Sequence, residues 1–245
     1  MSISTPPAPD PVRYIAQAVR LARSGRPLVF YDTETTGLYD EGAPPPRPWQ
    51  IAAIRRQGGT RVVAQRILKV GMPLPTRVCE ICRVPPDLPE QRGREPAVVL
   101  PQFAAFISGA IMIGHNSVAY DNRVMADAYR RAQLPVPAQF AETDVVAHLR
   151  APVHSIDTRL LAQAVLVDCL PRHLRTPREV ALGPGERGGL ALGPLGRYLG
   201  LSFDASRLHD GSVDVALCEL VFDELLARGA AILRASGIQS LPRSA

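Results

Sequence analysis

Short apolar runs of strand length alternate along this chain with segments in which apolar residues recur at helical spacing. The predicted strands are 28–32, 51–56, 61–70 and 110–114, and 156–167 is predicted as a strand that continues into a helix. The predicted helices are 12–23, 98–107, 118–131 and 213–227. Because three strands come first and helix and strand then alternate, the pattern predicts a single α/β domain with a mixed sheet flanked by helices. A chain of 245 residues is long enough to bury a sizeable core in such a domain.

In three further segments the apolar residues show no regular spacing. Residues 1–11 are polar and rich in proline, and we expect no fixed structure there. Residues 71–96 are predicted as a long surface loop, and 172–189, which are rich in Pro, Gly and Arg, as an exposed insertion. The predicted organisation is therefore an N-terminal extension with a short helix (1–26), a main domain (27–228) and a short C-terminal extension (229–245).

Composition narrows the class of protein further. No apolar stretch reaches about 18 residues, so the sequence predicts no membrane-spanning helix. Four cysteines are too few for a disulfide-stapled domain and no signal peptide is visible, so we expect a reducing, cytoplasmic location. The 28 lysines and arginines exceed the 23 acidic residues, and Lys69 is the only lysine. Arginine suits phosphate recognition, although a genomic preference for arginine codons explains the skew more simply.

Two acidic residues, separated by a single residue, lie at the end of the first predicted strand. Asp32 and Glu34 project from the same face, because alternate residues of a strand share a face. Two adjacent carboxylates repel each other unless a cation lies between them, and oxygen ligands of this kind suit Mg²⁺ or Mn²⁺. Thr35, Thr36 and Gly37 follow, and the backbone N–H groups of such a turn can bind a phosphate. Taken alone, an Asp-x-Glu pair is more often a plain acidic strand end.

Three further polar residues complete the set of candidates. Asp121 begins a predicted helix after the strand 110–114 and a short polar turn. His209 precedes Asp214 by five residues, and Asp214 lies in the first turn of the last predicted helix. Each also has an ordinary explanation: an exposed helix aspartate, a solvated loop histidine and a favourable charge at a helix N-terminus, respectively.

Together these stretches resemble the DEDDh 3′–5′ exonucleases of the ribonuclease H-like superfamily, a family that includes the epsilon subunit of DNA polymerase III, exonuclease I and ribonuclease T. The three motifs occur in order as Tyr31-Asp-Thr-Glu-Thr-Thr-Gly-Leu38, Gly114-His-Asn-Ser-Val-Ala-Tyr-Asp121 and His209-x-x-x-x-Asp214. Each motif alone is a weak signal, whereas three in order, each in its expected strand or helix context, are a strong one. Residues 141–152 have no counterpart in the family pattern.

The resemblance implies a ribonuclease H-like fold and hydrolysis of a phosphodiester bond with two divalent ions, Mg²⁺ or Mn²⁺. It assigns the four carboxylates of Asp32, Glu34, Asp121 and Asp214 to the ions, with Asp32 shared by both. His209 is assigned as the general base that takes a proton from the attacking water.

The same resemblance implies that the turn after the first strand holds the terminal nucleotide. The residues assigned to this role are Thr35, Thr36, Gly37, Leu38 and Tyr120. A half-buried core tyrosine is an equally good explanation for Tyr120. The expected substrate is a single-stranded or frayed 3′ end of DNA, cleaved largely without regard to sequence. A polymerase or a repair protein is an additional candidate partner, and no role for a membrane is expected.

Three alternatives stay open at this stage. RNA ends suit the same fold, because the sequence does not show the pocket that would read a 2′-OH. A non-catalytic nucleic-acid-binding adaptor could retain the fold, although it would not need all five polar positions. Cys79-x-x-Cys82 has the spacing of half a zinc site, with Cys169 and His173 as a distant second pair, but no second tight pair occurs.

Overall fold

The computed structural model describes residues 10–169 and 190–237, and its centre is a five-stranded sheet in the order β3-β2-β1-β4-β5. The strands are β1 (Leu28–Thr35), β2 (Pro48–Gln57), β3 (Thr60–Ile67), β4 (Ile111–Gly114) and β5 (Ser155–Asp157). β2 pairs antiparallel with β1 and β3, whereas β4 pairs parallel with β1 and β5. The predicted mixed sheet is confirmed, and the strand that carries Asp32 and Glu34 lies at its centre.

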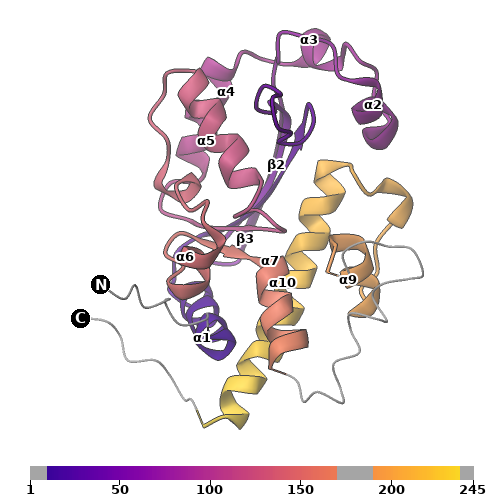
Figure 1. Cartoon of the computed structure of the whole chain (residues 1–245). Coiled ribbons are helices and arrows are strands. Elements are labelled where there is room, and N and C mark those ends of the chain that lie inside the picture. The colour runs from indigo at the N-terminus through magenta and orange to yellow at the C-terminus, as the bar shows by residue number, and fades with distance from the viewer. Residues whose placement is uncertain (1–9, 170–189, 238–245) are drawn as a thin grey trace, which may run out of the picture.

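Helices cover both faces of the sheet (Figure 1). One face packs against α4 (Pro96–Phe106) and α5 (Asp121–Arg131), and the other against α1 (Pro11–Ala22), α7 (Thr158–Gln163) and α10 (Gly211–Ala235). Further helical segments are α6 (Val145–Arg150), α9 (Leu192–Tyr198), the 3₁₀ turns η1 (Ala138–Phe140) and η4 (Ala205–Arg207), and the π-helical turn η2 (Ala164–Asp168).

Alternation along β1 decides which helices each side chain meets. Val29 and Tyr31 pack in the cluster that includes α4 and α5. Phe30 packs in the cluster on the other face, where its ring centroid lies 5.4 Å from that of Phe222 in α10. By the same alternation, Asp32 faces α10. A strand buried on both faces must be apolar almost throughout, which explains the continuous apolar run at this place in the sequence.

The N-terminal helix is part of the core. Asp10 caps α1 by accepting hydrogen bonds from backbone N–H groups of its first turn. Tyr14 and Ile15 are fully buried, and α1 packs along α10. At the other end of the chain, α10 continues to Ala235, beyond the predicted boundary at residue 228. Packing therefore continues across both predicted ends of the main domain.

The segment 71–96, predicted as a loop, instead contains two short helices, α2 (Thr76–Cys82) and α3 (Leu88–Arg92). Helices of seven and five residues are too short to be stable by themselves, so they leave little trace in a sequence pattern. Side chains from both helices pack against a small apolar cluster of Trp49, Val70 and Leu74. The loop prediction is wrong because this cluster, which exists only in the folded chain, stabilises the two helices.

Some predicted segments lie outside the described residues: 1–9 of the N-terminal segment, the insertion 172–189 and the last residues, 238–245. Within 10–169 and 190–237, no helix combines the length and the apolar character needed to cross a membrane.

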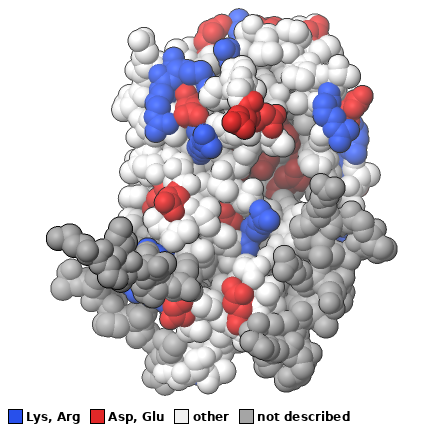
Figure 2. Space-filling view, viewed as in Figure 1, with Lys and Arg blue, Asp and Glu red and all other residues white. Residues whose placement is uncertain are grey.

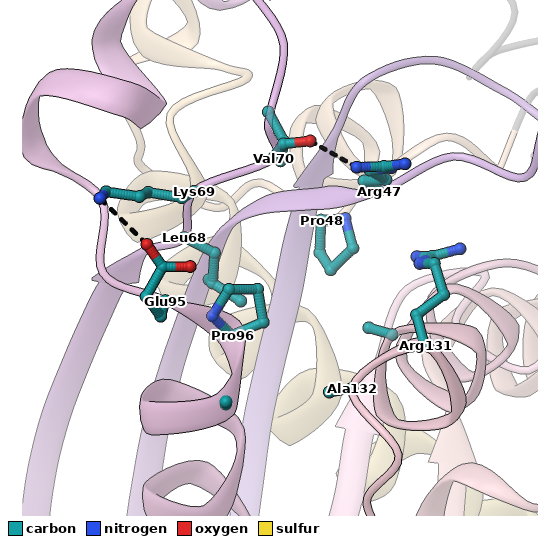
Figure 3. A pocket seen from close by; sticks show the side chains of 11 residues that line it. Arg47, Pro48, Leu68, Lys69, Val70, Glu95, Pro96, Arg131 and Ala132 are labelled. Atoms are coloured by element: carbon teal, nitrogen blue, oxygen red, sulfur yellow. Dashed lines mark hydrogen bonds and ion pairs between the residues drawn. The ribbon is translucent and has the colours of Figure 1, made fainter.

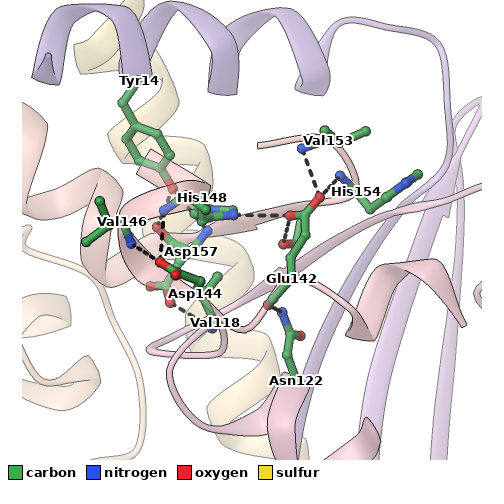
Figure 4. A network of polar contacts seen from close by, with 12 residues as sticks. Tyr14, Val118, Asn122, Glu142, Asp144, Val146, His148, Val153, His154 and Asp157 are labelled. Carbon is green, nitrogen blue, oxygen red and sulfur yellow. Dashed lines mark hydrogen bonds and ion pairs between the residues drawn. The ribbon is translucent and has the colours of Figure 1, made fainter. Parts of the chain in front are cut away.

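A buried polar network ties α1 to the segment 141–157 (Figure 4). The Tyr14 hydroxyl lies 3.1 Å from Nε2 of His148, whose Nδ1 lies 3.1 Å from Oε2 of Glu142. Glu142 also accepts hydrogen bonds from two backbone N–H groups and from the Ser155 hydroxyl. Burial alone would raise the pKa of Glu142, but these donors outweigh burial and lower it. One carboxylate thus anchors the segment that has no counterpart in the family pattern.

We expect Glu142→Ala to lower the free energy of unfolding by about 2–4 kcal/mol, because it leaves several buried donors without an acceptor. Urea denaturation followed by circular dichroism measures the loss. The control is Glu80→Ala, whose exposed carboxylate makes only a 3.8 Å ion pair with Arg77. That variant should change the free energy by less than about 0.5 kcal/mol. Equal losses in the two variants would contradict the anchoring role of Glu142.

Candidate active site

Acidic side chains from distant parts of the chain meet at the end of β1. Asp32 and Glu34 come from β1 and Asp214 from the first turn of α10, and each offers a carboxylate oxygen within 4.8 Å of the others. Figure 2 shows acidic side chains gathered in a recess on this face of the molecule, near the start of α10. Among the described residues, this is the one group of three or more His, Cys, Asp or Glu side chains close enough to share a metal ion.

A glycine allows α10 to bring Asp214 up to the sheet. A Cβ atom on Gly211 would lie 2.8 Å from Oε1 of Gln50 and 3.2 Å from the Cβ of Ala52, both in β2. It would also lie 3.7 Å from Oδ2 of Asp32. The start of α10 therefore rests directly on β1 and β2. Gly211, the small residue of the third motif, allows this close packing because it has no side chain.

The backbone of His209 is fixed by Asp214. The His209 N–H donates to Oδ2 of Asp214 at 3.0 Å, and its φ of 68° lies in the left-handed region that residues other than glycine seldom adopt. The side chain is exposed. Partial desolvation, and then the positive charge of Arg83, lower the pKa of His209. The imidazole is therefore neutral at pH 7 and able to accept a proton.

Asp121 reaches the same site as the first residue of α5. Its Oδ1 accepts hydrogen bonds from the Thr33 N–H at 3.1 Å and from the Thr33 hydroxyl at 2.5 Å. It does not belong to the group within 4.8 Å. After burial, however, its charge is the strongest influence that raises the pKa of Asp32. The structure thus brings all five predicted positions to one region, with Asp121 set slightly apart.

The turn before Asp121 is held by Asp157, which is not among the site residues predicted from the sequence. This buried residue at the end of β5 accepts hydrogen bonds from the N–H groups of Asn116 and Val118, each at 3.1 Å. The Asp157 N–H lies 3.3 Å from the Tyr14 hydroxyl, so α1 supports the same turn. An aspartate ahead of a predicted helix signals an N-cap, but nothing in the sequence signals this second set of contacts.

Crowding of these acids raises their pKa values. Burial first, and then neighbouring carboxylates, raise the pKa of Asp32 well above its usual range and that of Glu34 to about 7. Burial raises the pKa of Asp121 to about 7 and that of Asp214 to about 6. A divalent cation favours the ionised form of every carboxylate near it and therefore opposes these shifts.

The donor set fits a hard divalent cation. The group consists of carboxylate oxygens, the ligands that Mg²⁺ and Mn²⁺ prefer. Oδ1 of Asp214 is buried without a hydrogen-bond partner, which is costly for a carboxylate unless a cation binds it. The zinc alternative gains no such support. In the described part of the chain Cys79 and Cys82 join no group of potential ligands, and His173 lies outside it.

The residues predicted to hold the terminal nucleotide form the loop directly after β1. The hydroxyls of Thr35 and Tyr120 lie 2.7 Å apart, and both are within hydrogen-bond distance of the Gly37 carbonyl oxygen. Thr36 pairs through its N–H and its hydroxyl with the backbone just before β2. Leu38 is 67% exposed, so its side chain is free to meet a ligand. Tyr120 therefore holds the loop, a structural role that a substrate contact could accompany.

A separate pocket of about 430 Å³ lies between the start of β2, the segment after β3, the start of α4 and the end of α5 (Figure 3). Arg47 and Arg131 lie on one side of it, and the 3.0 Å ion pair of Lys69 with Glu95 lies on the other. None of the five predicted catalytic positions lines this pocket. The candidate chemistry therefore belongs to the acidic recess.

Comparison with known proteins agrees with this geometry. A family model described as exonuclease matches residues 29–171, which is more than half of the chain. The chain belongs to this exonuclease family. The resemblance drawn from the three motifs is thereby confirmed. The match includes Asp32, Glu34 and Asp121 but ends before His209 and Asp214, and the structure places the third motif beside the first.

The similar proteins are longer than this chain. DNA polymerase III PolC-type of Mycoplasma pneumoniae is 26% identical over 218 residues, which cover 87% of this chain and 12% of that protein. A structure of exonuclease I matches with a TM-score of 0.62 and 18% identity over 85% of this chain and 42% of that one. E. coli exonuclease I in complex with a dT13 oligonucleotide matches with a TM-score of 0.61 and 16% identity, over 85% and 43%. These structures share the exonuclease fold, and this chain corresponds to less than half of each.

The raised carboxylate pKa values predict how stability depends on pH. In the unfolded chain Glu34, Asp121 and Asp214 have ordinary pKa values near 4 and lose their protons at about that pH. In the folded protein without metal, their raised pKa values keep the protons bound to higher pH. The unfolding free energy of the metal-free protein should therefore fall as pH rises from about 4 to about 7. Thermal denaturation at several pH values with EDTA, and again with Mg²⁺, measures this. A metal-free protein that becomes steadily more stable over this range would contradict the assignment.

Removal of one charge should relieve the same repulsion. We expect Asp32→Asn to raise the thermal midpoint in EDTA at pH 8 by about 3–6 °C, which corresponds to about 1–2 kcal/mol. Mg²⁺ should raise the midpoint of the wild type and have little effect on that of the variant. Asp40→Asn, in the exposed loop nearby, is the control and should leave both responses unchanged.

Proposed function

We propose that this chain is a metal-dependent 3′–5′ exonuclease that removes nucleotides from DNA 3′ ends, as a proofreading or repair enzyme does. One observation carries the proposal: carboxylate oxygens of Asp32, Glu34 and Asp214 lie within 4.8 Å of one another, and the backbone N–H of His209 donates a hydrogen bond to Asp214. Membership of the exonuclease family supports the hydrolytic reaction. We place the catalytic unit in the predicted main domain, 27–228, together with α1, and its action in the cytoplasm.

In this proposal four carboxylates would hold two divalent ions, Mg²⁺ or Mn²⁺. Asp32 would serve both ions, Glu34 and Asp214 would complete one site, and Asp121 would hold the second ion, partly through water. The position of Asp121 just outside the close group supports this division. Two ions in such a site stabilise the charge that develops on the attacking and the leaving oxygen of a phosphodiester.

His209 accepts the proton of the attacking water. Its lowered pKa keeps the imidazole neutral at pH 7, and its side chain is exposed beside the acidic recess. The hydrogen bond from its N–H to Asp214 fixes the base relative to the carboxylates. Because the imidazole is exposed, it can return the proton to solvent after cleavage.

The 3′ nucleotide binds at the loop after β1 in this proposal. The loop presents Leu38, which is exposed, next to a turn held together by Thr35, Thr36, Gly37 and Tyr120. Contacts to phosphates, and packing of a side chain on the face of an unpaired base, do not read the identity of the base. We therefore expect cleavage of single-stranded or frayed ends largely without regard to sequence.

Two similar proteins support DNA as the substrate and a replication or repair partner. E. coli exonuclease I is known in complex with dT13, and exonuclease I forms a complex with SSB-Ct. The Mycoplasma pneumoniae relative is itself a DNA polymerase III of PolC type. RNA ends are the alternative substrate, and the assay below separates the two.

The test is release of mononucleotides from 3′-labelled single-stranded DNA, mismatched duplex DNA and RNA, each with Mg²⁺, Mn²⁺ or EDTA. We expect activity on DNA that requires the metal. His209→Ala should reduce the rate by about 10²–10⁴-fold and Asp32→Ala by more, since general-base help accounts for about that factor and Asp32 serves both ions. Asp40→Asn should act as the wild type does.

The results separate the hypotheses. Equal rates for Asp32→Ala and the wild type, or release in EDTA, would refute the assigned site. Faster cleavage of RNA would make the chain an exoribonuclease. Binding of single strands without any release of mononucleotides would indicate the adaptor.

A further inference from the structure

The end of α2 lies close to both sides of the acidic recess. Figure 1 shows α2 opposite the start of α10. The Sγ of Cys82, the last residue of α2, donates to Oε2 of Glu34 at 3.3 Å. Glu34 belongs to the first motif, so α2 touches one of the proposed metal ligands directly.

The next residue reaches the other side of the recess. The guanidinium of Arg83 donates to the carbonyl oxygen of Ser206 in η4, the turn that leads into His209. Its positive charge is also close enough to influence the His209 imidazole. Two consecutive residues therefore connect the strand of the first motif to the loop of the third.

The backbone changes conformation at Arg83, directly after α2. Arg83 has φ 55° and ψ 46°, a left-handed conformation that ends the helix. A non-glycine residue adopts this region at an energetic cost, and such residues occur where surrounding contacts require them. His209, across the recess, is left-handed as well.

The position of α2 is set by packing. Its Val78 and both of its cysteines contact the small apolar cluster of Trp49, Val70 and Leu74. Trp49 lies in β2 next to Gln50, whose backbone pairs with Glu34. The sheet that positions Glu34 thus also positions the helix that contacts it.

We propose that Cys82 and Arg83 form a clamp that positions the site: Cys82 orients the Glu34 carboxylate toward the ion, and Arg83 holds the loop that carries His209. This proposal rests on the proposed function for the identity of the ligands and of the base. A hydrogen bond to one oxygen of Glu34 leaves the other free for the ion. Neither clamp residue touches the reacting atoms, so both are positioning residues.

Cys79 provides a matched control for Cys82. It is half-buried on the same helix, but its thiol donates to the Leu74 carbonyl oxygen at 3.6 Å and touches no proposed ligand. Arg77, exposed near the start of α2, serves in the same way for Arg83.

The first experiment measures Mn²⁺ binding by calorimetry on the full chain, independently of activity. Cys82→Ala should weaken Mn²⁺ binding by about 3- to 10-fold, because loss of a ligand's hydrogen-bond partner lets the carboxylate reorient. Cys82→Ser retains a donor and should bind as the wild type does, and so should Cys79→Ala. If Cys82→Ala binds as tightly as Cys79→Ala, or if Cys82→Ser is as weak as Cys82→Ala, the role of Cys82 is refuted. Cys82→Val, closer in volume, replaces the alanine variant if thermal denaturation shows that the latter is unfolded.

The second experiment separates the metal site from the base. At saturating Mn²⁺, Arg83→Met should lower kcat by about 3- to 10-fold while its Mn²⁺ affinity stays at the wild-type value. Arg77→Met should change neither quantity. A kcat equal to that of Arg77→Met would refute the role of Arg83.

Failure of the clamp and failure of the proposed function give different results. Normal nuclease activity with unaltered Mn²⁺ binding in Cys82→Ala refutes the clamp and leaves the nuclease intact. A wild type that binds Mn²⁺ but releases no nucleotide refutes the nuclease, whereas the calorimetric comparison still decides whether Cys82 positions Glu34.

Discussion

Mutual repulsion of carboxylates is the constraint on which this structure depends. Asp32, Glu34 and Asp214 lie within 4.8 Å of one another in a partly buried recess, and Asp121 adds its charge from the side. Without the surrounding fold, these carboxylates would move apart or bind protons. The fold keeps them together, so their repulsion lowers the stability of the metal-free protein, and a divalent cation relieves that repulsion when it binds. Such a site lowers the folding stability of the protein and strengthens its binding of metal.

Rigid elements hold the acids in place. β1 is flanked by a strand on each side and buried on both faces, so Asp32 cannot shift without disturbing the whole sheet. Gly211 lets α10 rest on the sheet, and Thr33 fixes Asp121 through two hydrogen bonds to a single oxygen. Asp157 holds the turn that leads to Asp121. Each carboxylate thus has its own support, and these supports come from different parts of the chain.

Much of this arrangement could be predicted because its signals are local. The spacing of Asp32 and Glu34 on one strand, and the order of the three motifs, are visible in the sequence and lead to the sheet and to the family. The contacts of Cys82 and Arg83 could not be predicted. Their helix, α2, is too short to produce a helical pattern in the sequence, and it packs against an apolar cluster that forms only on folding. Asp157 was not predicted either, because its hydrogen bonds to the turn before Asp121 depend on the pairing of β4 with β5.

The buried Tyr14 has a practical consequence for anyone who wishes to shorten this protein. The exonuclease match begins at residue 29, and a chain cut there would retain all three motifs. It would lose α1, expose the side of α10 that α1 covers, and remove the hydroxyl that lies between His148 and Asp157. The limits of a family match are therefore a poor guide to where this catalytic unit can be trimmed.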